Sequence, residues 1–209
     1  MTLDQLIQAG VHLADLVAVD SHFTAIGIKD VGGIVHLKAA LVVLANIADL
    51  EPTLRPTCKV HPEPSAVIKP LGKNLAFAKY LRNKFVGHIH PELIAKAIEW
   101  QPVFRHASGR LEDPQFILFV NLWLLETAIN TYVEANGTHK VFESETDLLY
   151  PPDWRRFLGF LEETIRGSMS YLRLLNHLWA PTFALPDTAM FDLEAALKAA
   201  RTEFKFLAH

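Results

Sequence analysis

The residues of this chain that could do chemistry are concentrated between Arg82 and His88, in the sequence Arg-Asn-Lys-Phe-Val-Gly-His. A guanidinium binds and orients a phosphate, and an imidazole takes up or releases a proton near neutral pH. The side-chain amide of Asn83 can hold either a substrate or the histidine in place. This segment therefore combines an anion-binding group with a group that can transfer a proton.

The spacing of apolar residues predicts that Arg82 belongs to a helix covering residues 70–87. At about 100° per residue, Arg82 falls on the apolar side of that helix, which carries Leu71, Leu75, Ala78, Leu81 and Phe85. Burying an unpaired guanidinium costs on the order of several kcal/mol. We therefore expect Arg82 to meet an anion in a cleft or interface. The alternative is a structural ion pair with a carboxylate on a neighbouring helix.

His88 needs a bend in the chain to lie beside Arg82. An unbroken helix would turn it about 120° away, because the two residues are six positions apart. Gly87 can take the left-handed conformation of a helix cap and Pro91 opposes continuation, so the helix is expected to end at His88. The alternative is that Gly87 is an ordinary helix end and His88 a capping or packing residue. The neighbouring Arg82 and Asn83 favour the functional interpretation.

Arg-Asn followed by four residues and a histidine resembles the signature of the HEPN superfamily (higher eukaryotes and prokaryotes nucleotide-binding domains). Members of this family are all-helical, and many are metal-independent endoribonucleases that act as toxins or abortive-infection effectors. The resemblance implies catalytic roles for Arg82, Asn83 and His88. It also implies a symmetric homodimer in which two copies of the motif face one cleft, and an antitoxin as a candidate partner.

His90 marks a departure from the family pattern. Members that a partner nucleotidyltransferase modifies resemble one another in a tyrosine two residues after the histidine, where this chain has His90. The departure argues against regulation by that route. Because one histidine cannot easily act as base and acid in the same step, His90 is the in-chain candidate for a second proton carrier.

The function expected from these residues is metal-independent RNA cleavage by attack of the ribose 2′-hydroxyl, which leaves a 2′,3′-cyclic phosphate. No cofactor is expected, and no metal site either. Two histidines at the spacing of His88 and His90, without a separated third ligand, are weak evidence for a metal. Two alternatives stay open. One is a non-catalytic helical homodimer that binds a nucleotide, RNA or an acidic protein, and the other is a structural homodimer with Arg82 in an interface ion pair.

Charge is distributed unevenly along the chain. The net charge is −3, which by itself speaks against a general nucleic-acid binder. Residues 52–90 nevertheless carry seven Lys or Arg and one acidic residue. Such a segment attracts polyanions, and we expect Lys73, Lys79 and Lys84 to bind substrate. The alternative is a solvated lysine face on a surface helix, which would explain these lysines but not Arg82.

Composition indicates a cytoplasmic protein with a substantial core. Half of the 209 residues are hydrophobic, and a single cysteine, Cys58, excludes an internal disulfide and fits a reducing compartment. The start of the chain lacks the pattern of a signal peptide. The longest stretch without Asp, Glu, Lys, Arg or His, residues 114–125, is too short to span a bilayer, so no membrane association is expected.

Apolar periodicity predicts an all-α fold, a single helical bundle of about six to seven helices in one domain over residues 1–209. A proline-rich basic loop is expected at 52–66, and a small hairpin or loop at 101–112. The helix at 116–132 is apolar nearly all round and is therefore expected to be the central one. The other helices are expected at 2–19, 33–50, 70–87, 91–100, 152–179 and 187–206.

Overall fold

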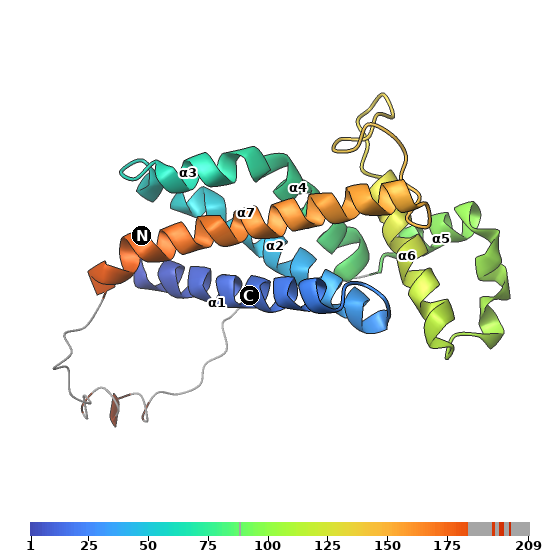
Figure 1. The fold of residues 1–209 in the computed structure, drawn as a ribbon, viewed down its shortest axis with the longest axis horizontal. Helices are drawn as coiled ribbons and strands as arrows, with labels where there is room; N and C mark the ends of the chain where they lie inside the picture. The colour runs from blue at the N-terminus through green and yellow to red at the C-terminus, as the bar shows by residue number, and fades with distance from the viewer. Residues whose placement is uncertain (88, 184–193, 195–196, 199–200, 202–209) are drawn as a thin grey trace.

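The computed structural model describes residues 1–87, 89–183, 194, 197, 198 and 201. This part of the chain forms an all-α bundle, which confirms the predicted fold class (Figure 1). Its α-helices are α1 (Leu3–Ala25), α2 (Val31–Cys58), α3 (Glu63–Ile68), α4 (Gly72–Leu81), α5 (Pro91–Trp100), α6 (Pro114–Asn130) and α7 (Pro151–Phe183). The helix expected at 187–206 lies largely outside the described residues.

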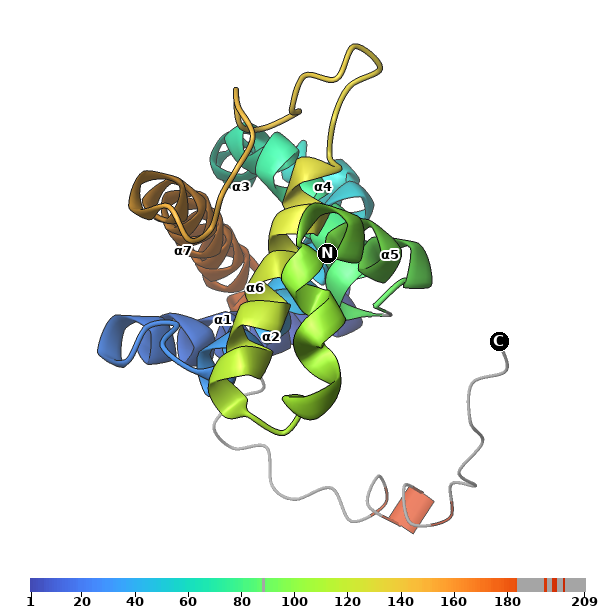
Figure 2. The same ribbon diagram turned by 90° about the vertical axis from the view of Figure 1, so that its right-hand side faces the viewer.

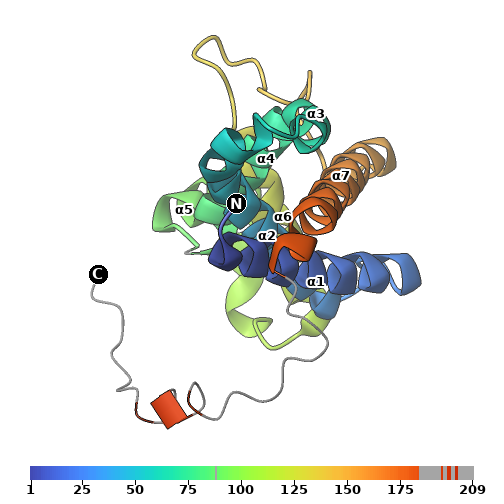
Figure 3. The same cartoon turned by 90° about the vertical axis from the view of Figure 1, so that its left-hand side faces the viewer.

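Helix α2 is the centre of the bundle. It packs against α1, α4, α6 and α7, and end-on views show it enclosed by the other helices (Figures 2 and 3). Seven of its apolar residues are completely buried, namely Leu37, Ala40, Leu41, Leu44, Ala45, Ile47 and Leu54. The long helices α1 and α7 lie side by side across one face of it (Figure 1). The burial of this apolar surface stabilises the fold.

The expectation that residues 116–132 form the central helix is wrong. In α6 the buried side chains are mostly in the C-terminal half, including Leu124, Leu125 and Ile129, whereas Phe119 remains 40% exposed. Apolar residues around a whole helix show that it could be enclosed. They do not show which of two such helices the others surround.

Within the described residues, α2 alone is long and apolar enough to cross a membrane by length and composition. Half of its most apolar stretch is buried inside the bundle. A core helix of a soluble protein has the same length and composition, so this criterion is weak evidence for a membrane span.

The predicted loop at 52–66 is also wrong. Helix α2 continues through Pro52 and Pro56 to Cys58, and α3 begins at Glu63. A proline inside a helix removes one hydrogen bond and strains the preceding turn. Here the continuation buries Leu54 and Cys58, which compensates for that loss. Burial also raises the pKa of the Cys58 thiol, which favours an unreactive, protonated sulfur.

Several predicted helix boundaries agree with the structure, and others do not. Helix α5 has the predicted bounds, and Asp113 caps α6 by accepting hydrogen bonds from the backbone N–H groups of Gln115 and Phe116. Helix α1 extends past the predicted end to Ala25. The hairpin considered at 101–112 is absent, because Pro102–Gly109 form a 3₁₀ helix (η3) instead.

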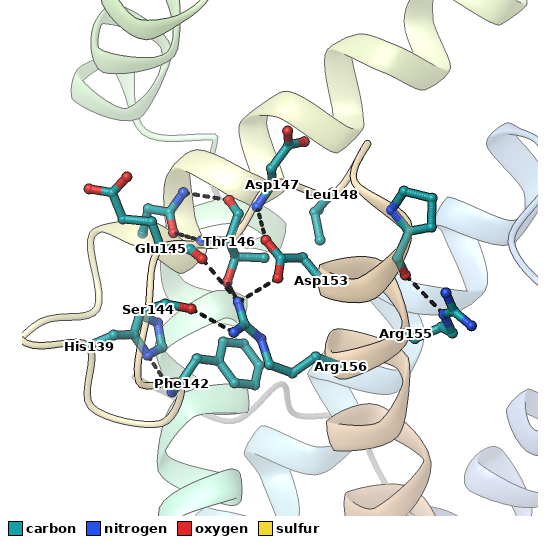
Figure 4. Close-up of polar contacts among 12 residues, drawn as sticks. His139, Phe142, Ser144, Glu145, Thr146, Asp147, Leu148, Asp153, Arg155 and Arg156 are labelled. Atoms are coloured by element: carbon teal, nitrogen blue, oxygen red, sulfur yellow. Dashed lines mark hydrogen bonds and ion pairs between the residues drawn. The ribbon is translucent and has the colours of Figure 1, made fainter.

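The loop between α6 and α7 is held to α7 by Arg156 (Figure 4). Its guanidinium donates hydrogen bonds to Ser144 Oγ at 2.7 Å, the Glu145 carbonyl at 3.0 Å and Thr146 Oγ1 at 3.1 Å. It also forms an ion pair with Asp153 at 3.1 Å. One side chain thus connects three successive loop residues to the helix.

His139 fixes the same loop to the end of α6. Its Nε2 lies 3.0 Å from the carbonyl oxygen of Ile129, while Nδ1 accepts hydrogen bonds from the backbone N–H groups of Val141 and Phe142. An Nδ1 that accepts must be unprotonated, so the ring is neutral with its proton on Nε2. Burial lowers the pKa of His139, and the hydrogen bond to Ile129 opposes this only in part.

We predict that His139 makes the folded protein less stable as the pH falls below 6.5, the ordinary pKa of histidine. The unfolded chain takes up a proton there, whereas the folded chain resists it down to its lowered pKa, so stability is lost through that interval. Urea unfolding at about pH 7.5 and about pH 5.5 measures the loss. Replacing His139 by Asn, which keeps an acceptor, should make the loss smaller. An unchanged loss would show that His139 does not contribute.

Candidate functional site

The motif segment begins with a π-helical turn. Helix α4 passes without interruption into η2 (Arg82–Val86), and the backbone N–H of Gly87 donates to the Arg82 carbonyl at 2.8 Å. Gly87 has φ −67° and ψ −47°, which is right-handed, so the expected left-handed cap is wrong. This hydrogen bond to the residue five positions earlier satisfies the Gly87 N–H while the backbone stays in the right-handed helical conformation. Single π turns within helices are found frequently at functional sites.

Arg82 is partly buried, with 30% of its side chain exposed. One terminal guanidinium nitrogen lies 3.6 Å from Oδ2 of Asp49 on α2. The Nε atom is buried and has no hydrogen-bond partner among the described residues. The guanidinium therefore has one long ionic contact and at least one donor that is unused.

Asp49 is shared between two cations. Its Oδ1 accepts a short hydrogen bond from the Lys79 ammonium, and Oδ2 faces Arg82. The Asp49 side chain is 49% exposed, so water screens both contacts. One carboxylate cannot neutralise two cations, so this surface keeps a local positive charge. The structure thus contains the neighbouring carboxylate that a structural ion pair of Arg82 requires, but this carboxylate neutralises Arg82 and Lys79 only in part.

The other predicted substrate-binding residues do not join this cluster. Asn83 and Lys73 are exposed and Lys84 is partly exposed, and within the described residues none of the three forms a hydrogen bond or ion pair. The structure thus brings together Arg82 and Lys79, which lie about one turn apart, through a residue of a different helix.

Of the two histidines at positions 88 and 90, His88 lies outside the described residues. His90 is exposed at the N-cap of α5, and its Nδ1 lies 3.5 Å from Oε2 of Glu92. The contact found for His90 is therefore with its own helix.

Lys38 on α2 is a further cation in contact with the motif segment, and the sequence pattern had not identified it. Its ammonium donates to Asn121 Oδ1 of α6 at 2.8 Å and lies 4.8 Å from the centroid of the Phe85 ring, which is part of η2. Asn121 is itself oriented by a hydrogen bond to the Ile117 carbonyl at 2.8 Å. Burial lowers the pKa of Lys38. No carboxylate of the described residues pairs with it.

A signal for Lys38 was present in the sequence. It is the one charged residue of the otherwise uncharged, mostly apolar stretch 31–48, apart from His36 if that is protonated. Arg82 stood out for the same reason, as a cation on an apolar helix side. Only the packing of α2 against η2 shows that the two cations flank the same segment.

No cluster of three or more His, Cys, Asp or Glu side chains that could hold a metal ion is found in the described part of the chain. No protein-family model, curated protein or solved structure matches this chain. The similarity of residues 82–88 to the HEPN signature is thus an inference from the motif alone.

We predict that Asp49→Asn changes the free energy of unfolding by less than about 1 kcal/mol, because both of its ion pairs are half-exposed. Asp153→Asn is the matched control. Asp153 is only 18% exposed, pairs with Arg156 and accepts from the backbone N–H of Asp147 at 2.9 Å. Its loss should cost about 1–3 kcal/mol. Urea unfolding measures both variants.

The comparison separates the two interpretations of Arg82. If Arg82 is a structural group that depends on Asp49, the Asp49→Asn variant leaves the guanidinium without a compensating charge. The free energy of unfolding should then fall by several times more, on the order of 3–5 kcal/mol. A cost of that size for Asp49→Asn would contradict a site that is open to an external anion.

Proposed function

We propose that this chain is a metal-independent endoribonuclease of the toxin or defence type, which leaves a 2′,3′-cyclic phosphate. One observation carries the proposal: Arg82 and Lys79 share the single half-exposed carboxylate of Asp49. A positive charge is therefore left over in a partly buried setting. A phosphate supplies both the opposite charge and the acceptors that the guanidinium still needs.

In the proposed reaction, Arg82 binds the non-bridging oxygens of the scissile phosphate. Negative charge accumulates on these oxygens when the 2′-oxygen attacks phosphorus and the bond to the 5′-oxygen breaks. A guanidinium fixed in advance stabilises that charge. The Nε–H of Arg82 has no partner among the described residues and can therefore donate to a phosphate oxygen.

His88 is the proposed general base for the 2′-hydroxyl, or the acid that protonates the leaving 5′-oxygen. Asn83 is proposed to hold the substrate or the imidazole. His90 is the in-chain candidate for the second proton transfer.

Lys38 adds a third cation to the proposed site, beside Arg82 and Lys79. A partly buried ammonium without a carboxylate partner is unfavourable in the free protein. A bound phosphate would relieve this cost, so the cation stabilises the complex more than the free chain. Lys38 is therefore proposed to bind the RNA backbone beside Arg82.

The assembly proposed with this function is a cytoplasmic homodimer, in which two copies of the motif face one cleft. RNA is the proposed substrate, and an antitoxin protein is the proposed partner. The basic character of residues 52–90 supports a polyanionic ligand.

The second candidate function is binding of RNA or a nucleotide without cleavage. The observation in its favour is the positive charge left over at Arg82 and Lys79, which would hold an anion whether or not a proton is transferred. In that case the same cations would retain the ligand, and no group would be required to move a proton.

We predict that the wild-type protein cleaves RNA in the presence of a chelator and leaves 2′,3′-cyclic phosphate ends. Arg82→Ala should lower the rate by about 100-fold or more, because it removes the charge that stabilises the transition state. His88→Ala should lower it by a similar factor, about 100-fold or more, because it removes the general acid or base. Gel electrophoresis of labelled RNA and end-group analysis measure the products.

Arg173→Ala and His177→Ala are the matched controls, since both residues are exposed on α7. They should cleave as the wild type does. Full cleavage by His88→Ala would overturn the assignment of the base. Binding of RNA without any cleavage by the wild type would support the second candidate function.

Lys38→Met tests the additional cation. Methionine has a similar volume and no charge, so the variant should be at least as stable as the wild type while binding RNA several-fold more weakly at low salt. Lys96→Met is the matched control. Lys96 also lies over an aromatic ring, that of Trp100, but Glu99 neutralises it. Equal RNA affinity of Lys38→Met and Lys96→Met, measured by fluorescence anisotropy, would exclude Lys38 from the site.

A further inference from the structure

A groove of about 540 Å³ runs between α2, α3 and α4. Its floor is apolar and consists largely of small or compact side chains, among them Ala48, Pro52, Leu75 and Ala76. Gly72 also lines it, and a Cβ added at Gly72 would meet no other atom within 4 Å. The groove is therefore open space rather than a packing defect filled by neighbouring side chains.

Cations lie at both ends of this groove. Helix α4 and the following η2 run antiparallel to α2, because Lys79 reaches Asp49 whereas Phe85, six positions later, meets Lys38, eleven positions earlier on α2. Lys79 therefore stands at the end near Ala48. Arg55 and Lys69 stand at the other end, about 10 Å away along the axis of α2.

A carboxylate, Glu51, lies between the two charged ends. Its oxygens accept hydrogen bonds from Arg55 at 2.8–3.1 Å, and its side chain is only 21% exposed. It would repel a phosphate from the middle of the groove. It still has free lone pairs for the N–H groups of a neutral ligand part.

Lys79 connects the groove with the Arg82 site. Lys79 lines the groove and shares Asp49 with Arg82, so a ligand at Arg82 has the end of the groove next to it. A ligand that fits has an anionic group at each end and a flat, neutral, partly apolar body between them. A nucleotide within an RNA strand has this distribution of charge.

We infer that the groove binds the nucleotide next to the scissile phosphate. Its base and ribose cover the apolar floor, the scissile phosphate lies at Lys79 and Arg82, and the next phosphate lies at Lys69, because Glu51 already neutralises Arg55. Glu51 accepts a hydrogen bond from an N–H of the base. The identity of the phosphate at Arg82 as the scissile one rests on the proposed function, whereas the occupation of the groove by RNA does not.

Ala76→Glu tests this inference, because Ala76 is exposed and a carboxylate there would fill the groove with negative charge. The probe is a fluorescently labelled RNA with 2′-O-methyl groups, which binds but lacks the attacking hydroxyl. The variant should bind at least about 10-fold more weakly than the wild type at low salt. Ala14→Glu, at an exposed alanine on α1, is the matched control and should bind as the wild type does.

Lys69→Ala tests the far end without adding a group to the groove. It should weaken binding several-fold and reduce the salt dependence, since it removes one phosphate contact. Lys29→Ala, an exposed lysine before α2, is its control. Circular dichroism of all variants shows whether the helices are retained.

The outcomes separate the groove from the nuclease proposal. Loss of binding by Ala76→Glu, together with no cleavage of natural RNA by the wild type, would retain the groove as an RNA site and reject the nuclease. Cleavage that Ala76→Glu and Lys69→Ala leave unchanged would reject the groove and retain the nuclease. No binding of the modified RNA by the wild type, or binding of an acidic peptide instead, would also overturn the inference.

Discussion

The burial of α2 is the constraint on which the rest of the structure depends. It packs against α1, α3, α4, α6 and α7, so its polar side chains lie where these helices leave its surface uncovered. Asp49 lies on such a line beside α4, and Lys38 lies where η2 and α6 meet. The packing of one apolar helix thus determines which charged groups face the motif.

The charge balance around α2 explains why this surface suits an anion. Lys79 and Arg82 share one screened carboxylate, and Lys38 has an amide oxygen and an aromatic ring as partners instead of an acid. Elsewhere in the described residues, cations such as Arg156 are bonded to a carboxylate and to several further acceptors. A positively charged surface that is only partly neutralised costs free energy in the free protein. A bound polyanion would remove this cost.

The parts of the fold that could be predicted are those determined by residues close to one another in the sequence. The bounds of α5 follow from Pro91 and an apolar stripe, and the start of α6 follows from the capping side chain of Asp113. The prolines at 52 and 56 were misleading, because the burial of Leu54 outweighs the local preference for a loop. The central helix was misassigned for a related reason, since composition does not determine which helix the others enclose.

The sequence by itself determined that the chain is helical and that Arg82 is a cation on the apolar side of a helix, because a period of 3.6 residues relates near neighbours only. Tertiary structure decided that Asp49, which lies 33 positions earlier, divides its charge between Arg82 and Lys79. It likewise decided that Lys38 lies against Phe85, and that a groove opens between α2, α3 and α4. These features depend on how separate helices pack, and no local pattern of residues specifies that.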